Sequence, residues 1–280
     1  MSKALAVIGG GNMAKAILDG AARAGVLPPT VIVADPSAER RALFTRAVER
    51  AGEAIAQLAQ AEEVPGSGQV LLAVKPQMLP EVARDVRAAI DAGVWGARRV
   101  VISILAGATA SRVREAFAAR AEVVRVMPNT PALVGRGMSA LCLGEGAESH
   151  DADLARALFS AVGKVIDVSE SQMDAFTAVG GSGPAYVFRL AEAMVAGAIE
   201  AGLDARDALL AVRETIAGAG LLLGESAESP GELRAQVTSK GGTTAAALEV
   251  FERGGFEATV VQAIVAARDR GAELSKMAGG

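Results

Sequence analysis

The chain has 280 residues, enough for one large or two medium domains with a sizeable core. It is 51% hydrophobic but only 3% aromatic, so Ala, Val, Leu and Ile must build that core. The net charge of −4, with acids and bases interspersed, argues against a nucleic-acid or membrane-surface partner. No apolar run is long enough to span a membrane, and the lone Cys142 excludes an internal disulfide and a cysteine metal cluster. We expect a soluble, cytoplasmic protein.

The first twenty residues predict a strand, a glycine-rich turn and a helix. Leu5 to Ile8 is a short apolar run typical of a buried strand. Gly9, Gly11 and Ala14 then fit the pattern G-x-G-x-x-[G/A]. The first glycine permits a tight turn, the second lets a pyrophosphate approach the backbone, and the small third residue lets the helix pack on the strand. Because free N–H groups at a helix start attract phosphate, this context predicts a dinucleotide-binding site.

A second strand is predicted over 30–34, followed by Asp35, and Ser37 is expected to cap a charged surface helix over 39–50. Asp35 stands near the position where an acidic residue binds the ribose 2′-hydroxyl of NAD. Arg40 and Arg41 follow, and either could instead meet a 2′-phosphate. The alternative is that Asp35 is an ordinary turn residue before proline.

Further strands are predicted over 69–74, 100–105, 122–127, 138–143 and 164–168, with a helix over 151–162. The first three of these strands lead into the loops 75–77, 106–109 and 128–131. Because open α/β sheets bind ligands at the carboxyl ends of their strands, these loops are candidates for a site, although the proline-flanked loop 128–131 could be an ordinary turn. The alternation of strands and helices predicts a doubly wound sheet.

From Glu170 onward the sequence predicts helices only, over 185–202, 205–224, 229–237, 245–253 and 257–276. The helices over 185–202 and 205–224 are apolar most of the way round, so they must be buried. A domain of about 110 residues has limited interior to hide them, and helices of a second subunit would solve this.

The polar, glycine-rich stretch 238–244 is a second candidate site. Gly241 and Gly242 precede a predicted helix start, and Thr243 or Thr244 lies near its N-cap. Backbone N–H groups and a hydroxyl in this arrangement can bind a small carboxylate, although the stretch could also be a helix cap without a ligand.

The acid–base inventory is sparse. The only histidine, His150, precedes a predicted surface helix and is expected to be solvated, and no residues show metal-ligand spacing or a Ser-His-Asp set. An alcohol dehydrogenase normally needs a general base or a metal, whereas a protonated imine is already electrophilic. The inventory therefore favours an imine substrate.

At five places the sequence resembles the pyrroline-5-carboxylate reductase family, over essentially its whole length. The matching stretches are 8–13 (IGGGNM), 73–77 (AVKPQ), 127–131 (MPNTP), 181–186 (GSGPAY) and 237–244 (VTSKGGTT). The resemblance implies an oxidoreductase of proline biosynthesis that uses NADPH or NADH to reduce L-1-pyrroline-5-carboxylate to L-proline. It implies an α/β fold, with a Rossmann-type doubly wound domain over 1–168 and an all-helical substrate and dimerisation domain over 169–280. The partners would be the small substrate and a second copy of the chain, with higher assembly in some members.

The same resemblance implies roles for individual residues. Thr244 would be catalytic, its hydroxyl bonded to the ring nitrogen. The substrate would be surrounded by Glu170, Val237, Gly242, Thr243 and Thr244. The cofactor would be held by Gly9, Gly10, Gly11, Asn12, Met13, Asp35, Ala73, Val74, Lys75, Pro76, Ala106, Gly107 and Asn129. No metal is implied.

Two departures and two alternatives accompany this interpretation. Many relatives have Pro at Lys240 and Ser at Gly180, and Lys240 could add charge toward the substrate carboxylate or simply face water. A β-hydroxyacid dehydrogenase has a similar layout, but it needs a catalytic lysine in the helical domain, where Lys240 and Lys276 are the only candidates. A non-catalytic dinucleotide-sensing module would not need the polar stretch 238–244.

Overall fold

The computed structural model describes residues 4–44, 50–52, 68–91 and 99–277. The chain divides into two compact units, one of residues 1–182 with 267–280 and the other of residues 183–266. No helix in the described ranges is sufficiently long and apolar to cross a membrane.

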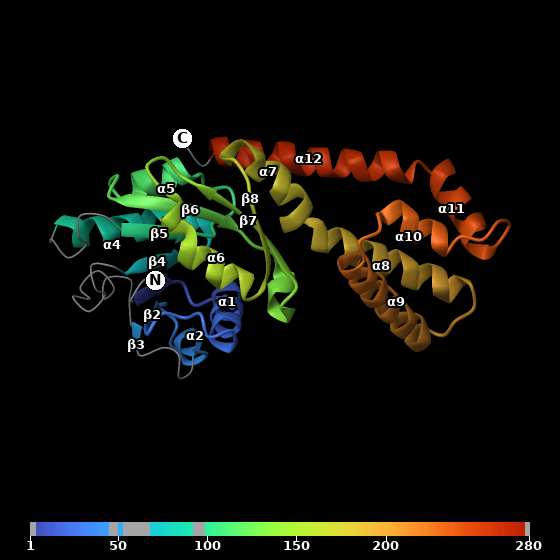
Figure 1. Ribbon diagram of the computed structural model, residues 1–280, viewed down its shortest axis with the longest axis horizontal. Coiled ribbons are helices and arrows are strands. Elements are labelled where there is room, and N and C mark those ends of the chain that lie inside the picture. The colour runs from blue at the N-terminus through green and yellow to red at the C-terminus, as the bar shows by residue number, and fades with distance from the viewer. Residues whose placement is uncertain (1–3, 45–49, 53–67, 92–98, 278–280) are drawn as a thin grey trace. The chain divides into compact units, whose positions relative to one another are not determined.

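The first unit is built on an eight-stranded sheet (Figure 1). The strands are β1 (Ala4–Ile8), β2 (Thr30–Ala34), β3 (Arg50–Gly52), β4 (Gln69–Leu72), β5 (Arg99–Ser103), β6 (Ala121–Met127), β7 (Gly137–Leu143) and β8 (Gly163–Asp167). They lie in the order β3-β2-β1-β4-β5-β6-β7-β8, and all neighbours pair in parallel except β6 and β7. The order 3-2-1-4-5-6 is that of a doubly wound nucleotide-binding sheet, so the predicted fold class is confirmed.

Helices cover both faces of this sheet. They are α1 (Asn12–Arg23), α2 (Ala38–Ala42), α4 (Leu79–Asp91), α5 (Ala110–Ala116) and α6 (Asp153–Ser160), with short 3₁₀ turns η1 (Pro76–Met78), η2 (Thr130–Val134) and η3 (Ser149–Ala152). Alternate residues of each strand face opposite sides. In β1, Ala4, Ala6 and Ile8 join the cluster under α4 and α5, whereas Leu5 and Val7 join the cluster under α1 and α6.

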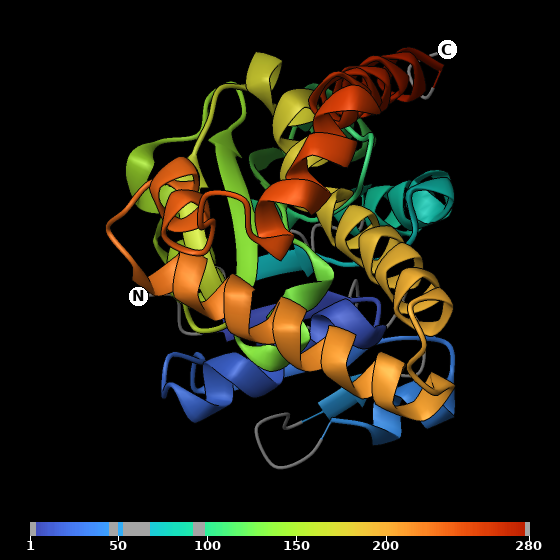
Figure 2. The ribbon, with the colours of Figure 1, turned by 90° about the vertical axis from the view of Figure 1, so that its right-hand side faces the viewer.

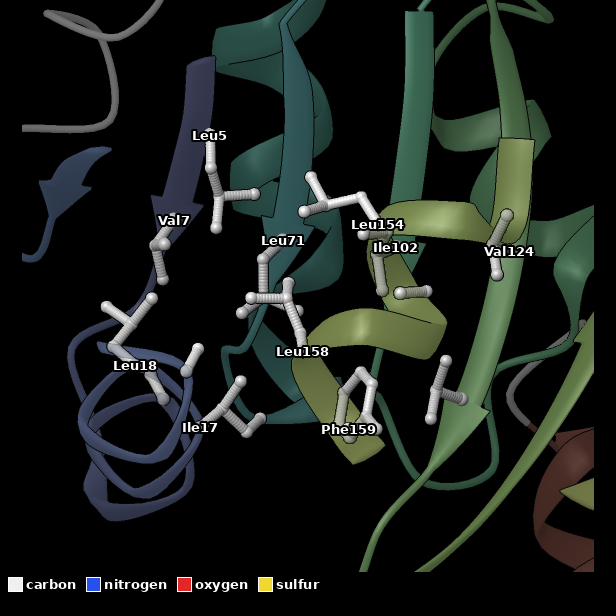
Figure 3. Packing of buried hydrophobic residues seen from close by; sticks show 14 of the residues in the cluster. Leu5, Val7, Ile17, Leu18, Leu71, Ile102, Val124, Leu154, Leu158 and Phe159 are labelled. Atoms are coloured by element: carbon white, nitrogen blue, oxygen red, sulfur yellow. The ribbon is translucent and has the colours of Figure 1, made fainter. Parts of the chain in front are cut away.

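Figure 3 shows the second of these clusters from close by. Ile17 and Leu18 of α1, together with Leu158 and Phe159 of α6, pack against side chains of the central strands. Each of these four side chains is at most 3% exposed. At roughly 1.5–3 kcal/mol for each large apolar side chain buried, this packing fixes the position of α1 and therefore of the glycine turn before it.

Two local features differ from the sequence prediction. The helix predicted over 39–50 begins as expected, with the Ser37 hydroxyl accepting the Arg40 amide, but α2 ends at Ala42 and Arg50 belongs to β3. Charged residues without an apolar stripe gave no signal for where this helix should stop. The second feature is the reversal of direction between β6 and β7, which apolar runs alone do not reveal.

The first unit continues past the predicted boundary at residue 168. The segment after β8 forms η4 (Glu170–Gln172), α7 (Met173–Phe176) and η5, a π-helix over Thr177–Gly181. Met173 is fully buried against Ala140 and Cys142 of β7. This apolar contact explains why residues 169–182 are part of the first unit.

The second unit consists of helices in the part of the chain that is described, as predicted for this half. The helices are α8 (Gly183–Glu200), α9 (Ala205–Glu225), α10 (Pro230–Gln236), α11 (Thr243–Arg253) and α12 (Phe256–Met277), whose last turns belong to the first unit. Figure 2 shows α8 and α9 as two long helices joined by a short connection. Many of their apolar side chains are exposed in a single chain, including Phe188, Leu190, Leu210, Leu221, Leu222 and Leu223.

Candidate active site

The glycine turn after β1 has the conformation that the motif requires. Gly9 has φ of +101°, a region that side chains other than glycine rarely adopt. A Cβ built on Gly9 would lie 2.7 Å from the carbonyl oxygen of Ala73 in the neighbouring loop. The Gly9 amide also donates to the carbonyl of Ala34 at 2.8 Å. The turn is therefore fitted between the ends of β2 and β4, and only glycine can occupy its first position.

The start of α1 leaves room for a ligand. Gly11 is the N-cap, and among the described residues no side chain bonds to the first amides of the helix. A Cβ added at Gly11 would meet no atom within 4 Å. Asn12 is exposed and Met13 half-buried in the first turn. An uncapped helix start next to open space fits a dinucleotide pyrophosphate.

Asp35 lies beside this turn, but its carboxylate is directed into the protein. Oδ2 accepts the Gly10 amide at 2.9 Å, and Oδ1 accepts the Ser37 amide at 2.8 Å. The residue is only 2% exposed. Arg40 places Nη1 3.5 Å from Oδ2, while Arg41 donates to the backbone carbonyl of Asp35 at 2.7 Å. The carboxylate thus supports the glycine turn. Of the paired side chains Arg40 and Asp35, that of Arg40 is the exposed one.

The next loops follow the adjacent strands of the sheet. Ala73 and Val74 are half-buried after β4, whereas the side chain of Lys75 is exposed at the start of η1. Ala106 and Gly107 follow β5, and Gly107 has φ of +72°. Since β1, β4 and β5 are neighbours and run parallel, the structure brings these predicted cofactor residues to one edge of the sheet.

Asn129 follows β6 at the same edge, and its amide group is used within the protein. Oδ1 accepts the Met138 amide at 2.9 Å, and Nδ2 donates to the Gly180 carbonyl at 2.8 Å. Asn129 is 8% exposed. The side chain therefore links the end of β6 to the start of β7 and to the π-helix Thr177–Gly181.

Glu170, predicted to touch the substrate, forms an ion pair with Arg125 of β6. Its other oxygen, Oε2, accepts the Cys142 thiol at 3.1 Å. Burial raises the pKa of this thiol to about 12, and the bond to Glu170 adds to the shift. Arg125 and Cys142 are paired residues of β6 and β7, so the three side chains form a cluster on the sheet.

The remaining predicted substrate residues lie in the second unit. Val237 ends α10 and is 65% exposed. Gly242 is the N-cap of α11, and no side chain in the described ranges caps it. Thr243 and Thr244 form the first turn of α11, and Gly241 before them has φ of +71°. Lys240 is exposed. This helix start, like that of α1, offers amides without an internal partner.

Two members of the Glu170 cluster were not anticipated from the sequence. Arg125 could have been detected, because it is the one basic residue within the apolar run VVRVM. The structure shows that its side chain is buried. Cys142, a lone buried cysteine, carries no such signal in the sequence. Across the described residues, no group of three or more His, Cys, Asp or Glu side chains is arranged to hold a metal ion.

The chain is similar to known proteins along most of its length. A family model described as pyrroline-5-carboxylate reductase dimerisation matches residues 170–274, and one described as NADP oxidoreductase, coenzyme F420-dependent, matches residues 4–107. A pyrroline-5-carboxylate reductase of Synechocystis is 40% identical over 99% of this chain and 100% of its own.

Solved structures agree with these matches. A pyrroline-5-carboxylate reductase from Coxiella burnetii has a TM-score of 0.84 at 32% identity, covering 98% of both chains. The Plasmodium falciparum pyrroline carboxylate reductase, solved with NADP bound, has a TM-score of 0.79 at 26% identity, covering 97% of both chains.

Proposed function

Since the chain belongs to the pyrroline-5-carboxylate reductase family, we propose that the two uncapped helix starts, at Gly11 and Gly242, bind the cofactor and the substrate of that reaction. The enzyme is an oxidoreductase that reduces L-1-pyrroline-5-carboxylate to L-proline, the product of proline biosynthesis, with NADPH or NADH. Membership of this family argues against the two alternative functions, a β-hydroxyacid dehydrogenase and a non-catalytic sensing module.

The residues of the first unit fit a dinucleotide. The amides of Gly11, Asn12 and Met13 would hold the pyrophosphate at the start of α1, with Gly9 and Gly10 shaping the turn. Ala73 to Pro76 and Ala106-Gly107 would line the path from adenosine to nicotinamide. When bound, the reduced nicotinamide supplies the hydride. Asp35 serves this site by holding the Gly10 amide, which supports the pyrophosphate turn from behind.

The residues of the second unit fit a small carboxylate bound next to a ring nitrogen. The first amides of α11, at Thr243 and Thr244, would hold the carboxylate. The Thr244 hydroxyl would bond to the ring nitrogen, which is protonated as an imine and becomes a secondary amine. Val237 would contact the ring. Because hydride adds to the carbon of the C=N bond while its π electrons move to nitrogen, orienting one ring face supplies much of the rate.

Glu170 carries the other predicted substrate contact. Its carboxylate is already shared between Arg125 and Cys142, so any substrate contact would use a remaining lone pair. We propose that the Arg125 ion pair fixes this carboxylate in one orientation before substrate binds.

Residues 170–274 match a family model for dimerisation, and we propose that the helical unit forms a homodimer with interleaved helices. The proposal rests on the exposed apolar side chains of α8 and α9, such as Phe188 and Leu222, which are 63% and 57% exposed in a single chain. Exposed apolar surface on this scale favours association. The cytoplasmic location expected from the sequence stays a prediction.

One assay tests the proposed function against its alternatives. NAD(P)H oxidation is followed with pyrroline-5-carboxylate, then NAD(P)⁺ reduction with hydroxyacids, and then each cofactor alone. We expect turnover only with the imine. Turnover of a hydroxyacid, or cofactor binding without any turnover, would contradict the proposal.

A further inference from the structure

We propose that Asn129 is a positioning residue, which acts through the π-helix Thr177–Gly181 and not by direct contact with the cofactor. The inference rests on the proposed function, because the expected effect of Asn129 is on the rate of imine reduction. It replaces the direct cofactor contact that the sequence suggested for this residue.

The amide of Asn129 links the end of β6 to the start of β7, nine residues later, and to the π-helix, 51 residues away. Its oxygen accepts a hydrogen bond from the Met138 amide at 2.9 Å, and its nitrogen donates one to the Gly180 carbonyl at 2.8 Å. Both partners are backbone groups, so the side chain fixes the path of the main chain on both sides. With 8% of the residue exposed, little of it is available to a ligand. Buried hydrogen bonds of this kind are costly to break, because the partner left behind stays unsatisfied.

The segment that Asn129 holds has an unusual conformation. The Ser182 amide donates to the carbonyl of Thr177, five residues earlier, at 2.8 Å. Such π-turns are rare and occur frequently at functional sites. Residue 184, four positions after Gly180, is a proline without an amide hydrogen, so the Gly180 carbonyl lacks its α-helical donor and accepts Asn129 Nδ2 instead.

The π-turn is also held from its other side. A Cβ added at Gly180 would lie 2.5 Å from the Phe176 ring, which packs in the cluster of Ala140, Cys142 and Met173. The ring therefore presses against the bare face of Gly180 while Asn129 binds its carbonyl. Together the two contacts define one position for the turn.

The position of this turn matters because it continues the segment of the first unit that begins at Glu170, one of the proposed substrate residues. Glu170 accepts the Cys142 thiol, and Phe176 packs in the same cluster as Cys142. A displacement of a substrate-positioning element by about 1 Å can cost up to 100-fold in rate, even when the chemistry lies elsewhere. Asn129 is thus expected to influence imine turnover more than cofactor affinity.

The first test is Asn129→Asp. An ionised carboxylate still accepts the Met138 amide but cannot donate to the Gly180 carbonyl, so only one of the two bonds is lost. We expect kcat for pyrroline-5-carboxylate to fall about 10-fold, while the Kd for NADPH changes less than about 2-fold. Thr177→Val is the matched control, because it removes another hydrogen bond of the same segment, from Thr177 Oγ1 to the Met173 carbonyl. It should leave kcat unchanged.

The second test approaches the turn from Phe176 and leaves Asn129 intact. Gly180→Ala should lower kcat with NADPH affinity retained, and the added Phe176→Leu change should restore much of the loss by making room. Hydrogen exchange of the Ser182 amide, which donates to the Thr177 carbonyl, measures the stability of the turn independently of enzyme activity. It should be faster in Asn129→Asp and in Gly180→Ala than in the wild type.

Each outcome decides between the possibilities. Loss of NADPH affinity in parallel with turnover in Asn129→Asp would make Asn129 a direct cofactor ligand and overturn the inference. Full turnover in both variants, or unchanged Ser182 exchange, would also overturn it. If Asn129→Asp does not fold, Gly180→Ala and its rescue decide alone. A wild-type enzyme without imine turnover would refute the proposed function instead, and Ser182 exchange and NADPH affinity would still test the link.

Discussion

The Gly10 amide and the Asp35 carboxylate, which belong to different βα units, meet in a 2.9 Å hydrogen bond at the glycine turn after β1. A buried carboxylate that accepts two backbone amides acts as part of the scaffold. The residue that the sequence suggested as a ribose ligand therefore has a clear structural task.

The first prediction concerns this bond. Asp35→Asn keeps the shape of the side chain but leaves one of the two amides, Gly10 or Ser37, facing an NH₂ group. We expect KM to rise about 3- to 10-fold for NADPH and for NADH, since a lost buried hydrogen bond costs roughly 1 kcal/mol or more. Steady-state kinetics with both cofactors measure the effect. A change confined to NADH would instead indicate that Asp35 binds the ribose 2′-hydroxyl.

The second prediction concerns the first glycine of the motif. Gly9→Ala places a methyl group 2.7 Å from the Ala73 carbonyl at φ of +101°. Gly25→Ala is the matched control, because Gly25 has φ of +67° but no atom within 4 Å of its Cβ position. We expect the control to lose about 1 kcal/mol of unfolding free energy and to keep NADPH affinity. Gly9→Ala should lose more stability, by urea unfolding, and about 10-fold or more in NADPH affinity. Equal behaviour of the two variants would show that the contact with Ala73 is unimportant.

The third prediction concerns Thr244. Thr244→Ala removes the hydroxyl proposed to bond to the ring nitrogen and keeps the backbone amides. We expect kcat/KM for the imine to fall about 10- to 100-fold, or roughly 1.4–2.8 kcal/mol, with NADPH affinity nearly unchanged. Thr259→Ala, which removes a hydroxyl from the first part of α12, is the control. Full turnover of Thr244→Ala would reduce Thr244 to a residue of the helix start.

The fourth prediction concerns assembly. Leu222→Glu introduces a charge among Leu221, Leu222 and Leu223 of α9, each about half exposed in a single chain. We expect sedimentation to show a shift from dimer to monomer, with loss of activity, because a buried unpaired charge is costly. Leu43→Glu changes a similarly exposed leucine of the first unit and should leave the assembly intact. A stable, active wild-type monomer at micromolar concentration would rule the dimer out.

The fifth prediction concerns Cys142. Burial and the bond to Glu170 raise the pKa of its thiol from 9.0 to about 12, so the folded chain keeps the thiol protonated where the unfolded chain ionises. The unfolded state then binds fewer protons, and stability should fall as pH rises above about 9. At neutral pH, iodoacetamide should label Cys142 only after unfolding, as mass spectrometry would show. Rapid labelling of the native protein would mean that the thiol is accessible.

The sequence predicted the elements that depend on local patterns. The apolar run of β1, the small residues of the glycine turn and the stripe of α1 each have a spacing that reports one conformation, and the structure has them at those places. The ends of elements were less predictable. The helix after Ser37 stops at Ala42, where no glycine or proline marks an end.

The candidate site was predictable as a set of loops, but not as a set of contacts. The link from Asn129 to Gly180 spans 51 residues, and that from Arg125 to Glu170 spans 45. Such side-chain contacts follow from the packing of β6 and β7 against the segment after β8, and no periodicity in the sequence encodes them. The motif around Asn129 predicted a candidate loop, whereas the hydrogen bonds of its side chain to Met138 and Gly180 became apparent only in the structure.

Two of the apolar clusters of the first unit share the strand β1, which restricts where the chain can gain or lose residues. In β1, even-numbered residues serve one cluster and odd-numbered residues the other. Insertion of a single residue before Gly9 would exchange the two sets and move the glycine turn relative to Ala73. Natural variants of this enzyme should therefore accept many apolar substitutions in β1 and β4, while insertions and deletions should be confined to connections outside the strands.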